Sequence, residues 1–172
     1  RALTVQDFWT GKGLSLDSNI QFGEGGAGAF SDGKLTSRSK DTLGRFVLET
    51  LVEHGAPKDI LYWHKPHIGS DVLPQVVAAL RRHIEELGGE FRYGCRVTGF
   101  LLRQGAIEGV RFLDAAGEQD LPVEYLVLAV GNGAREIYHS LAALDLAMEA
   151  KPFAVGLRIA HAQSMLDQGQ YG

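Results

Sequence analysis

The most unusual chemical feature of this 172-residue sequence is a cluster of glycines near its start. Gly23, Gly25, Gly26, Gly28 and Gly33 fall within eleven residues, in a chain that contains 22 glycines. Glycine is used where the backbone turns tightly or approaches a ligand closely, and successive N–H groups in such a loop can bind an anion. The cluster therefore predicts an ordered loop that faces an anionic or planar ligand. The alternative is a mobile surface loop.

This segment is similar to two nucleotide-binding motifs, but the neighbouring residues that each motif requires are absent. Residues 23–28 satisfy G-x-G-x-x-G, but a dinucleotide fingerprint also needs a helix directly after it and an acidic residue about 20 positions on. Here Asp32-Gly33 predicts a turn, and the acidic residues at that distance lie in or beside an expected helix. Residues 28–34 approach a P-loop, but Leu35 stands where Ser or Thr would bind magnesium. We reject both motifs at this site.

A second glycine-rich turn, Gly131-Asn132-Gly133, directly follows the apolar run 125–130. Ligands of α/β proteins bind outside the carboxyl ends of the strands. The small residues Ala129 and Gly131 would let a cofactor approach the backbone there. A plain strand-to-helix turn that needs glycine is the alternative.

The six histidines are the candidate acid–base groups, and their spacing matches no metal-binding motif. His64 and His67 flank Lys65 and Pro66 in an expected loop, so His64, Lys65 and His67 form the candidate catalytic group. Exposed or packing histidines are the alternative. The single cysteine, Cys95, excludes an internal disulfide and a cysteine-based zinc cluster, and we expect it to be a buried structural thiol.

Charge and hydropathy exclude several classes of partner. The chain has 17 basic and 21 acidic residues, a net charge of −4 and a pI near 5.9, so it lacks the footprint of a nucleic-acid or anionic-membrane binder. Its longest apolar run, 125–130, is far shorter than the ~20 residues of a membrane helix. One cysteine fits a reducing compartment, and we expect a cytoplasmic protein.

Hydrophobic periodicity predicts the elements that position these residues. Residues 1–40 are expected to be mostly loop. Helices are expected over 41–54, 71–87 and 134–144. Strands are expected over 20–22, 90–97, 98–103, 106–113, 121–123, 125–130 and 153–159, of which 125–130 would be covered on both faces. A meander placed before a buried strand is typical of flavoprotein dinucleotide-binding domains.

Four longer motifs resemble one family. They are Phe22–Leu35 (FGEGGAGAFSDGKL), Lys65–Ser70 (KPHIGS), Val127–Arg135 (VLAVGNGAR) and Lys151–Arg158 (KPFAVGLR). Together they resemble the FAD-dependent dehydrogenases often described as NAD(FAD)-utilising dehydrogenases. These are bacterial flavoproteins distantly similar to glutathione-reductase-type enzymes.

The resemblance implies an α/β fold, with a partial FAD/NAD(P)-binding Rossmann-like domain that carries a β-meander insertion, plus pieces of a second, substrate-side domain. It divides the chain into a Gly-rich cofactor-facing segment (1–40), a piece of the substrate-side domain (41–67), part of the FAD-binding domain (68–150) and a return into the substrate-side domain (151–172). Because the chain starts at Arg1 and the family's pyrophosphate fingerprint would lie upstream, we expect an internal piece of a longer protein.

The resemblance also implies site residues. The glycine-rich loop would lie against the pyrophosphate and flavin, Val97 would meet the adenine, and the turn near Gly131 would cover the ribose and phosphates. The expected cofactor-binding residues are Gly23, Gly25, Gly26, Ala27, Gly28, Ser31, Asp32, Gly33, Lys34, Leu35, Val97, Ala129, Gly131, Asn132 and Ala134. No metal ligand is expected.

The expected function is that of an internal part of an FAD-dependent oxidoreductase, in which the flavin carries the hydride. Its partners would be FAD, a small-molecule substrate, NADH or NADPH as electron donor, and the remainder of the parent chain, without which the piece would be inactive. The alternatives are a non-catalytic or tRNA-modification-type protein with a structural flavin, and a P-loop-type nucleotide-binding module, against which Leu35 argues.

Overall fold

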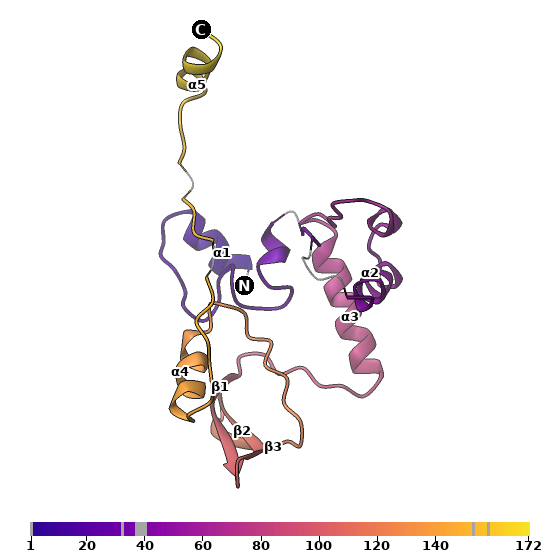
Figure 1. Ribbon diagram of the computed structural model, residues 1–172, viewed down its shortest axis with the longest axis vertical. Coiled ribbons are helices and arrows are strands. Elements are labelled where there is room, and N and C mark those ends of the chain that lie inside the picture. The colour runs from indigo at the N-terminus through magenta and orange to yellow at the C-terminus, as the bar shows by residue number, and fades with distance from the viewer. Residues whose placement is uncertain (1, 32, 37–40, 153, 158) are drawn as a thin grey trace. The chain divides into compact units, whose positions relative to one another are not determined.

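The computed structural model describes residues 2–31, 33–36, 41–152, 154–157 and 159–172 (Figure 1). The chain forms two units, residues 1–140 and 141–172. The described helices are α1 (Ala2–Trp9), α2 (Leu43–Glu53), α3 (Leu73–Glu86), α4 (Arg135–Ala143) and α5 (Gln163–Gln170), with 3-10 helices η1 (Ala27–Phe30) and η2 (Lys58–Leu61). The described strands are β1 (Arg96–Arg103), β2 (Ala106–Asp114) and β3 (Gly117–Pro122). No helix in this described part is long and apolar enough to cross a membrane.

The three strands form an antiparallel meander in the order β1-β2-β3, as the sequence predicts. Gln104 and Gly105 join β1 to β2, with φ angles of 52° and 80°. Two consecutive positive φ values give the tight turn whose twist matches that of the flanking strands. A register shift between Val97 and Gly99 bends the start of β1. Together with the helices, this sheet confirms a mixed helix-and-strand class.

Several predicted strands are wrong. Residues 90–95 lie outside the sheet, and Gly94 adopts a φ of 60°, which an extended strand does not accommodate. Residues 20–22 form bends, and residues 154–157 and 159 lie outside any strand, while 153 and 158 are not among the described residues.

The apolar run 125–130 is also not the buried strand that the sequence predicts. It carries no strand pairing in the described structure, and Tyr125 and Val127 are 88% and 87% exposed. An apolar run becomes a central strand only where other strands flank it and helices cover it. The sheet described here is the meander alone, so the parallel arrangement expected around 125–130 is not part of it.

The first two helices differ in whether the sequence predicts them. The described part of residues 1–40 is mostly loop, as predicted, apart from η1 and the unpredicted helix α1, which buries Val5. The predicted helix 41–54 is confirmed as α2, and the Asp41 carboxylate accepts a hydrogen bond from Leu43 N at 2.8 Å. Leu48, Leu51 and Val52 of this helix pack on the core, whereas Phe46 is 65% exposed.

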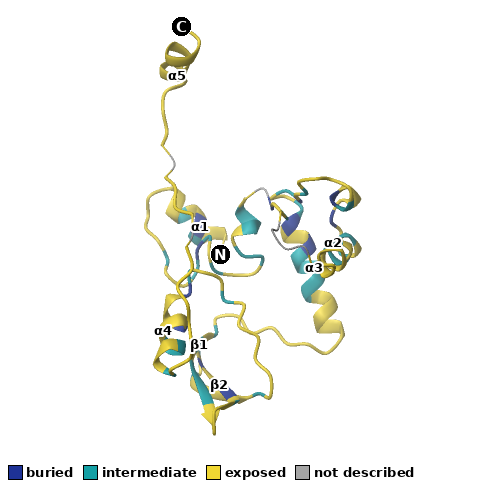
Figure 2. Cartoon of the chain, in the orientation of Figure 1, coloured by how far each residue is buried: buried dark blue, intermediate teal, exposed yellow. Residues whose placement is uncertain are grey.

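The principal core lies between α2, η2 and the N-terminal half of α3. Figure 2 shows buried residues along α3, and α2 and α3 run side by side in Figure 1. The buried members of this core cluster are Ala56, Ile60, Ile68, Leu73 and Val76. Leu73 and Val76 lie three residues apart, about one turn of a helix, and this periodicity predicts α3. Gly88, with a φ of 90°, follows the end of the helix. The residue at the N-cap position, Val72, makes no side-chain capping hydrogen bond.

The glycine-rich loop rests on the same half of α3. A Cβ at Gly28 would lie 3.1 Å from Leu73 Cδ2, and one at Gly33 would lie 3.3 Å from it and 3.4 Å from Gly69 N. A Cβ at Gly25 would lie 3.6 Å from Val77 Cγ2. The absence of side chains therefore lets the loop approach α3 closely, which gives part of the glycine cluster a packing role.

We expect Ile60→Ala to lower the free energy of unfolding by about 2–5 kcal/mol, because the side chain is 1% exposed and its loss leaves a cavity in the core cluster. Leu43→Ala is the control, since Leu43 is 64% exposed and its truncation should change that free energy by only about 0.5 kcal/mol. Urea unfolding of the intact protein measures both. Equal effects of the two substitutions would show that this core is not formed.

One substitution at two glycines should act in opposite directions. Gly33→Ala should destabilise the protein by about 1–2 kcal/mol, because Gly33 has a φ of 61° and close neighbours. Gly44→Ala should stabilise it by about 0.5–1 kcal/mol, because Gly44 lies in α2 with open space around its Cβ position. Thermal unfolding compares the pair. A stabilising Gly33→Ala would contradict the loop conformation.

Candidate functional site

Two cavities of the described residues concern the candidate site. The larger has a volume of about 660 Å³ and lies within the unit 1–140. Three parts of the sequence meet around it: the segment before and at the start of the glycine-rich loop, the chain around the start of β1 with the end of β2, and the turn into α4. Its lining residues are Leu16, Asp17, Phe22, Gly23, Arg92, Tyr93, Gly94, Cys95, Arg96, Val97, Leu113, Asp114, Val130, Ala134, Glu136 and Ile137.

Three residues from separate segments that are expected to bind a cofactor line this one cavity. Gly23 comes from the glycine-rich loop, Val97 from β1 and Ala134 from the turn before α4. Phe22 and Val130, which neighbour expected residues, line it as well. Ala134 is buried, Val97 is half-buried and Gly23 is exposed, so the wall runs from the protein interior to solvent.

Local contacts fix the turn into α4. The Tyr138 hydroxyl of α4 donates a hydrogen bond to the Gly131 carbonyl at 2.9 Å, which ties the turn to its own helix. A Cβ at Gly133 would lie 2.6 Å from Gln21 Oε1 and 3.3 Å from Phe22 Cζ. A side chain at position 133 would force the Gln21 side chain to move, so glycine lets the turn contact the residues that lead into the glycine-rich loop closely.

The charges around the cavity are mixed. Asp17, Asp114 and Glu136 are acidic and Arg92 and Arg96 are basic, so the acidic groups outnumber the basic ones. Carboxylates accept hydrogen bonds from hydroxyl groups, whereas they repel phosphates. Neutral, hydroxyl-bearing and aromatic ligand groups therefore suit this lining better than a pyrophosphate does.

Arg92 is held in place from two sides. Its Nε donates to Glu90 Oε1 at 2.9 Å, and this hydrogen bond raises the pKa of the Arg92 guanidinium. Its Cζ also lies 5.5 Å from the centre of the Phe112 ring, a cation–π distance. A guanidinium held in this way offers a flat, charged surface on which a planar ligand ring can stack.

Tyr93 and Cys95 complete this part of the cavity wall. Partial desolvation raises the pKa of the Tyr93 phenol, and Glu24 raises it further, so the hydroxyl stays a neutral donor at pH 7. Cys95 is only partly buried and faces the cavity, which corrects the expectation of a buried structural thiol. No motif includes Arg92, Tyr93 or Arg96, so the sequence did not predict them as site residues.

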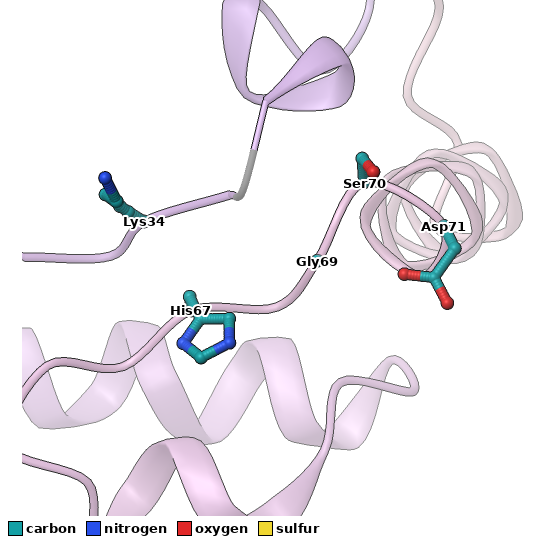
Figure 3. A pocket seen from close by; sticks show the side chains of 5 residues that line it. All are labelled: Lys34, His67, Gly69, Ser70 and Asp71. Carbon is teal, nitrogen blue, oxygen red and sulfur yellow. The ribbon is translucent and has the colours of Figure 1, made fainter. Parts of the chain in front are cut away.

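The smaller cavity has a volume of about 320 Å³ and lies where the chain enters α3 (Figure 3). Its lining residues are Lys34, His67, Gly69, Ser70 and Asp71. Lys34 and His67 form an antiparallel β-bridge, flanked by hydrogen bonds from Leu35 N to the Pro66 carbonyl and from Ile68 N to the Gly33 carbonyl, at 2.9 and 3.2 Å. The structure thus joins an expected cofactor residue to an expected catalytic residue.

The other members of the expected catalytic group do not join His67. His64 and Lys65 are exposed, and neither lines either of these cavities. His67 instead stacks on Trp63, with ring centres 5.2 Å apart.

The remaining expected cofactor residues also stand apart from the larger cavity. Leu35 packs on the core cluster, and Asp32 lies outside the described residues. The residues that line neither cavity are Gly25, Gly26, Ala27, Gly28, Ser31, Gly33, Ala129, Gly131 and Asn132.

Comparison with known proteins finds a curated relative, whose description states no function. A protein of Clostridium beijerinckii, described only as an uncharacterized protein, is 43% identical over all 172 residues. No family model matches the chain. The aligned region is 32% of that protein, so the chain spans about a third of the length of the curated relative it matches.

Proposed function

We propose that the intact protein is an FAD-dependent oxidoreductase and that this chain supplies part of its FAD-binding region, as a piece of a Rossmann-like domain. The observation that carries the proposal is the larger cavity. Gly23, Val97 and Ala134 come from three different segments, the family resemblance assigns each of them to the cofactor, and all three line the same cavity.

The residues present fit one end of a dinucleotide. A volume of about 660 Å³ lies within the usual range for small-molecule sites, roughly 300–1,000 Å³. Gly23 and Ala134 are small enough for a ligand to approach the backbone, and Phe22 and Val97 supply apolar surface. The acidic excess around the cavity favours the nucleoside end of FAD over its pyrophosphate.

The chain's own residues would then hold and orient the cofactor. Asp17 and Glu136 would accept hydrogen bonds from ribose hydroxyls, and Arg92 would stack on the planar base. Bound FAD supplies hydride transfer, for which the protein provides position and electrostatics.

At the smaller cavity, the bridge holds Lys34 and His67 at fixed backbone positions. Lys34 would place positive charge near the reduced flavin, and His67 would be the acid–base group. The larger cavity would therefore bind the cofactor, and the residues of the smaller cavity would take part in the chemistry.

Val97→Glu should weaken FAD binding by the intact protein at least tenfold, or about 1.4 kcal/mol, because it adds a further negative charge to the cavity wall. Leu102→Glu is the matched control, since it makes a comparable change on β1 at a residue outside the cavity. Flavin retained per protein, read from the visible spectrum, measures the effect. Val97→Phe fills the same space without charge and should act in the same direction.

Circular dichroism and the unfolding temperature separate lost binding from lost folding in these variants. If folded Val97→Glu and Val97→Phe proteins keep the flavin content of the parent, the assignment of this cavity fails. A colourless parent protein that stays colourless with added FAD would remove the whole proposal.

Anaerobic addition of NADH or NADPH should bleach the bound flavin, and the oxidised spectrum should return with oxygen. Reduction is expected because a dehydrogenase passes a hydride through its flavin. Lys34→Gln should slow reduction more than it lowers flavin content, whereas Lys58→Gln, at an exposed residue outside both cavities, should change neither. A flavin that neither nucleotide reduces would favour the structural-flavin alternative.

A further inference from the structure

Two histidines from different helices meet away from both cavities. His54 follows the last turn of α2 and His83 lies in α3. His54 Nε2 is 2.9 Å from His83 Nδ1, and the ring centres are 5.0 Å apart with the planes tilted by 38°. Neither ring lines the larger or the smaller cavity.

A backbone contact decides which nitrogen of His54 carries the proton. His54 Nδ1 lies 2.7 Å from the Thr50 carbonyl oxygen, which can only accept a hydrogen bond. Nδ1 is therefore the protonated nitrogen, and in the neutral ring the lone pair of Nε2 faces His83. Metal-binding histidines are typically oriented in this way, with one N–H donated to a carbonyl and the other nitrogen left for the ion.

The ring separation also suits a shared metal ion. With metal–nitrogen distances of about 2.0–2.1 Å, two imidazoles at a tetrahedral angle have nitrogens about 3.4 Å apart and ring centres about 5.2 Å apart. The observed ring separation of 5.0 Å is close to that value, while the nitrogens are about 0.5 Å closer. A small tilt of the rings, with their centres nearly fixed, would open the nitrogens toward one ion.

We propose that His54 Nε2 and His83 Nδ1 bind a divalent late first-row metal ion, of the class Zn²⁺, Ni²⁺ or Cu²⁺, which prefers imidazole ligands. Within the described residues, no group of three His, Cys, Asp or Glu side chains is placed to hold a metal ion. The site is therefore built on two protein ligands, and water fills the other positions. To ligate, neutral His83 moves its proton from Nδ1 to Nε2 through solvent, with no net proton released.

The ion would link the C-terminal end of α2 to α3. These helices enclose the core cluster, and α3 also supports the glycine-rich loop through Leu73 and Val77. Binding to the folded state alone stabilises that state by mass action. A filled site would thus strengthen the support of the loop without adding a group to either cavity.

The test uses the intact protein, purified without a polyhistidine tag and stripped with a chelator. We expect calorimetry with Ni²⁺ and with Zn²⁺ to show one site, and each ion to raise the unfolding temperature reversibly. His54→Gln and His83→Gln should each weaken binding at least tenfold, and His139→Gln, on the exposed face of α4, should leave it unchanged. Protons compete for both rings, so binding should be weaker at about pH 5.5 than at about pH 8.

Several outcomes overturn the proposal. Unchanged affinity in both ring variants would place the ion elsewhere, and loss of binding in His139→Gln would show a different site. Absence of binding at millimolar metal would leave the rings joined only by their hydrogen bond. If a variant does not fold, NMR of the parent protein decides, because Zn²⁺ must shift the ring signals of His54 and His83 and of no other histidine. None of these readouts depends on flavin.

Discussion

The rest of the structure depends on the close packing around Leu73 at the start of α3. This side chain belongs to the core cluster and also lies beside the Cβ positions of Gly28 and Gly33. One residue therefore couples the hydrophobic core to the glycine-rich loop. Because close-packed interiors leave little room for adjustment, the loop has to be nearly free of side chains where it meets the helix.

This packing divides the glycine cluster between two tasks. Gly25, Gly28 and Gly33 face α3 or the loop itself, so their lack of a Cβ is used inside the protein. Gly23 lines the larger cavity, and a Cβ at Gly26 would meet open space. The part of the loop that lines the larger cavity is accordingly its start, at Gly23. An ion pair from Arg81 on α3 to Glu24, at 2.9 Å, holds that part against the same helix.

Local patterns predicted the elements whose stability is local. The spacing of Leu73 and Val76 predicted α3, and the polar turn at Gln104 predicted the first hairpin of the meander. The buried strand predicted over 125–130 failed because its burial depends on partners far away in the chain. These residues are apolar enough for a central strand, yet composition alone does not supply the neighbours that would pair with them.

The candidate site follows the same rule. The resemblance implied Gly23, Val97 and Ala134 separately, but only the fold could bring them to one cavity, because no spacing relates three distant segments. The charged lining residues also come from separate segments. Arg92 lies just before β1 and Arg96 begins it, whereas the acidic residues are Asp17, Asp114 and Glu136. The mixed charge of the cavity therefore depends on how the fold brings these segments together, and no local pattern predicts it.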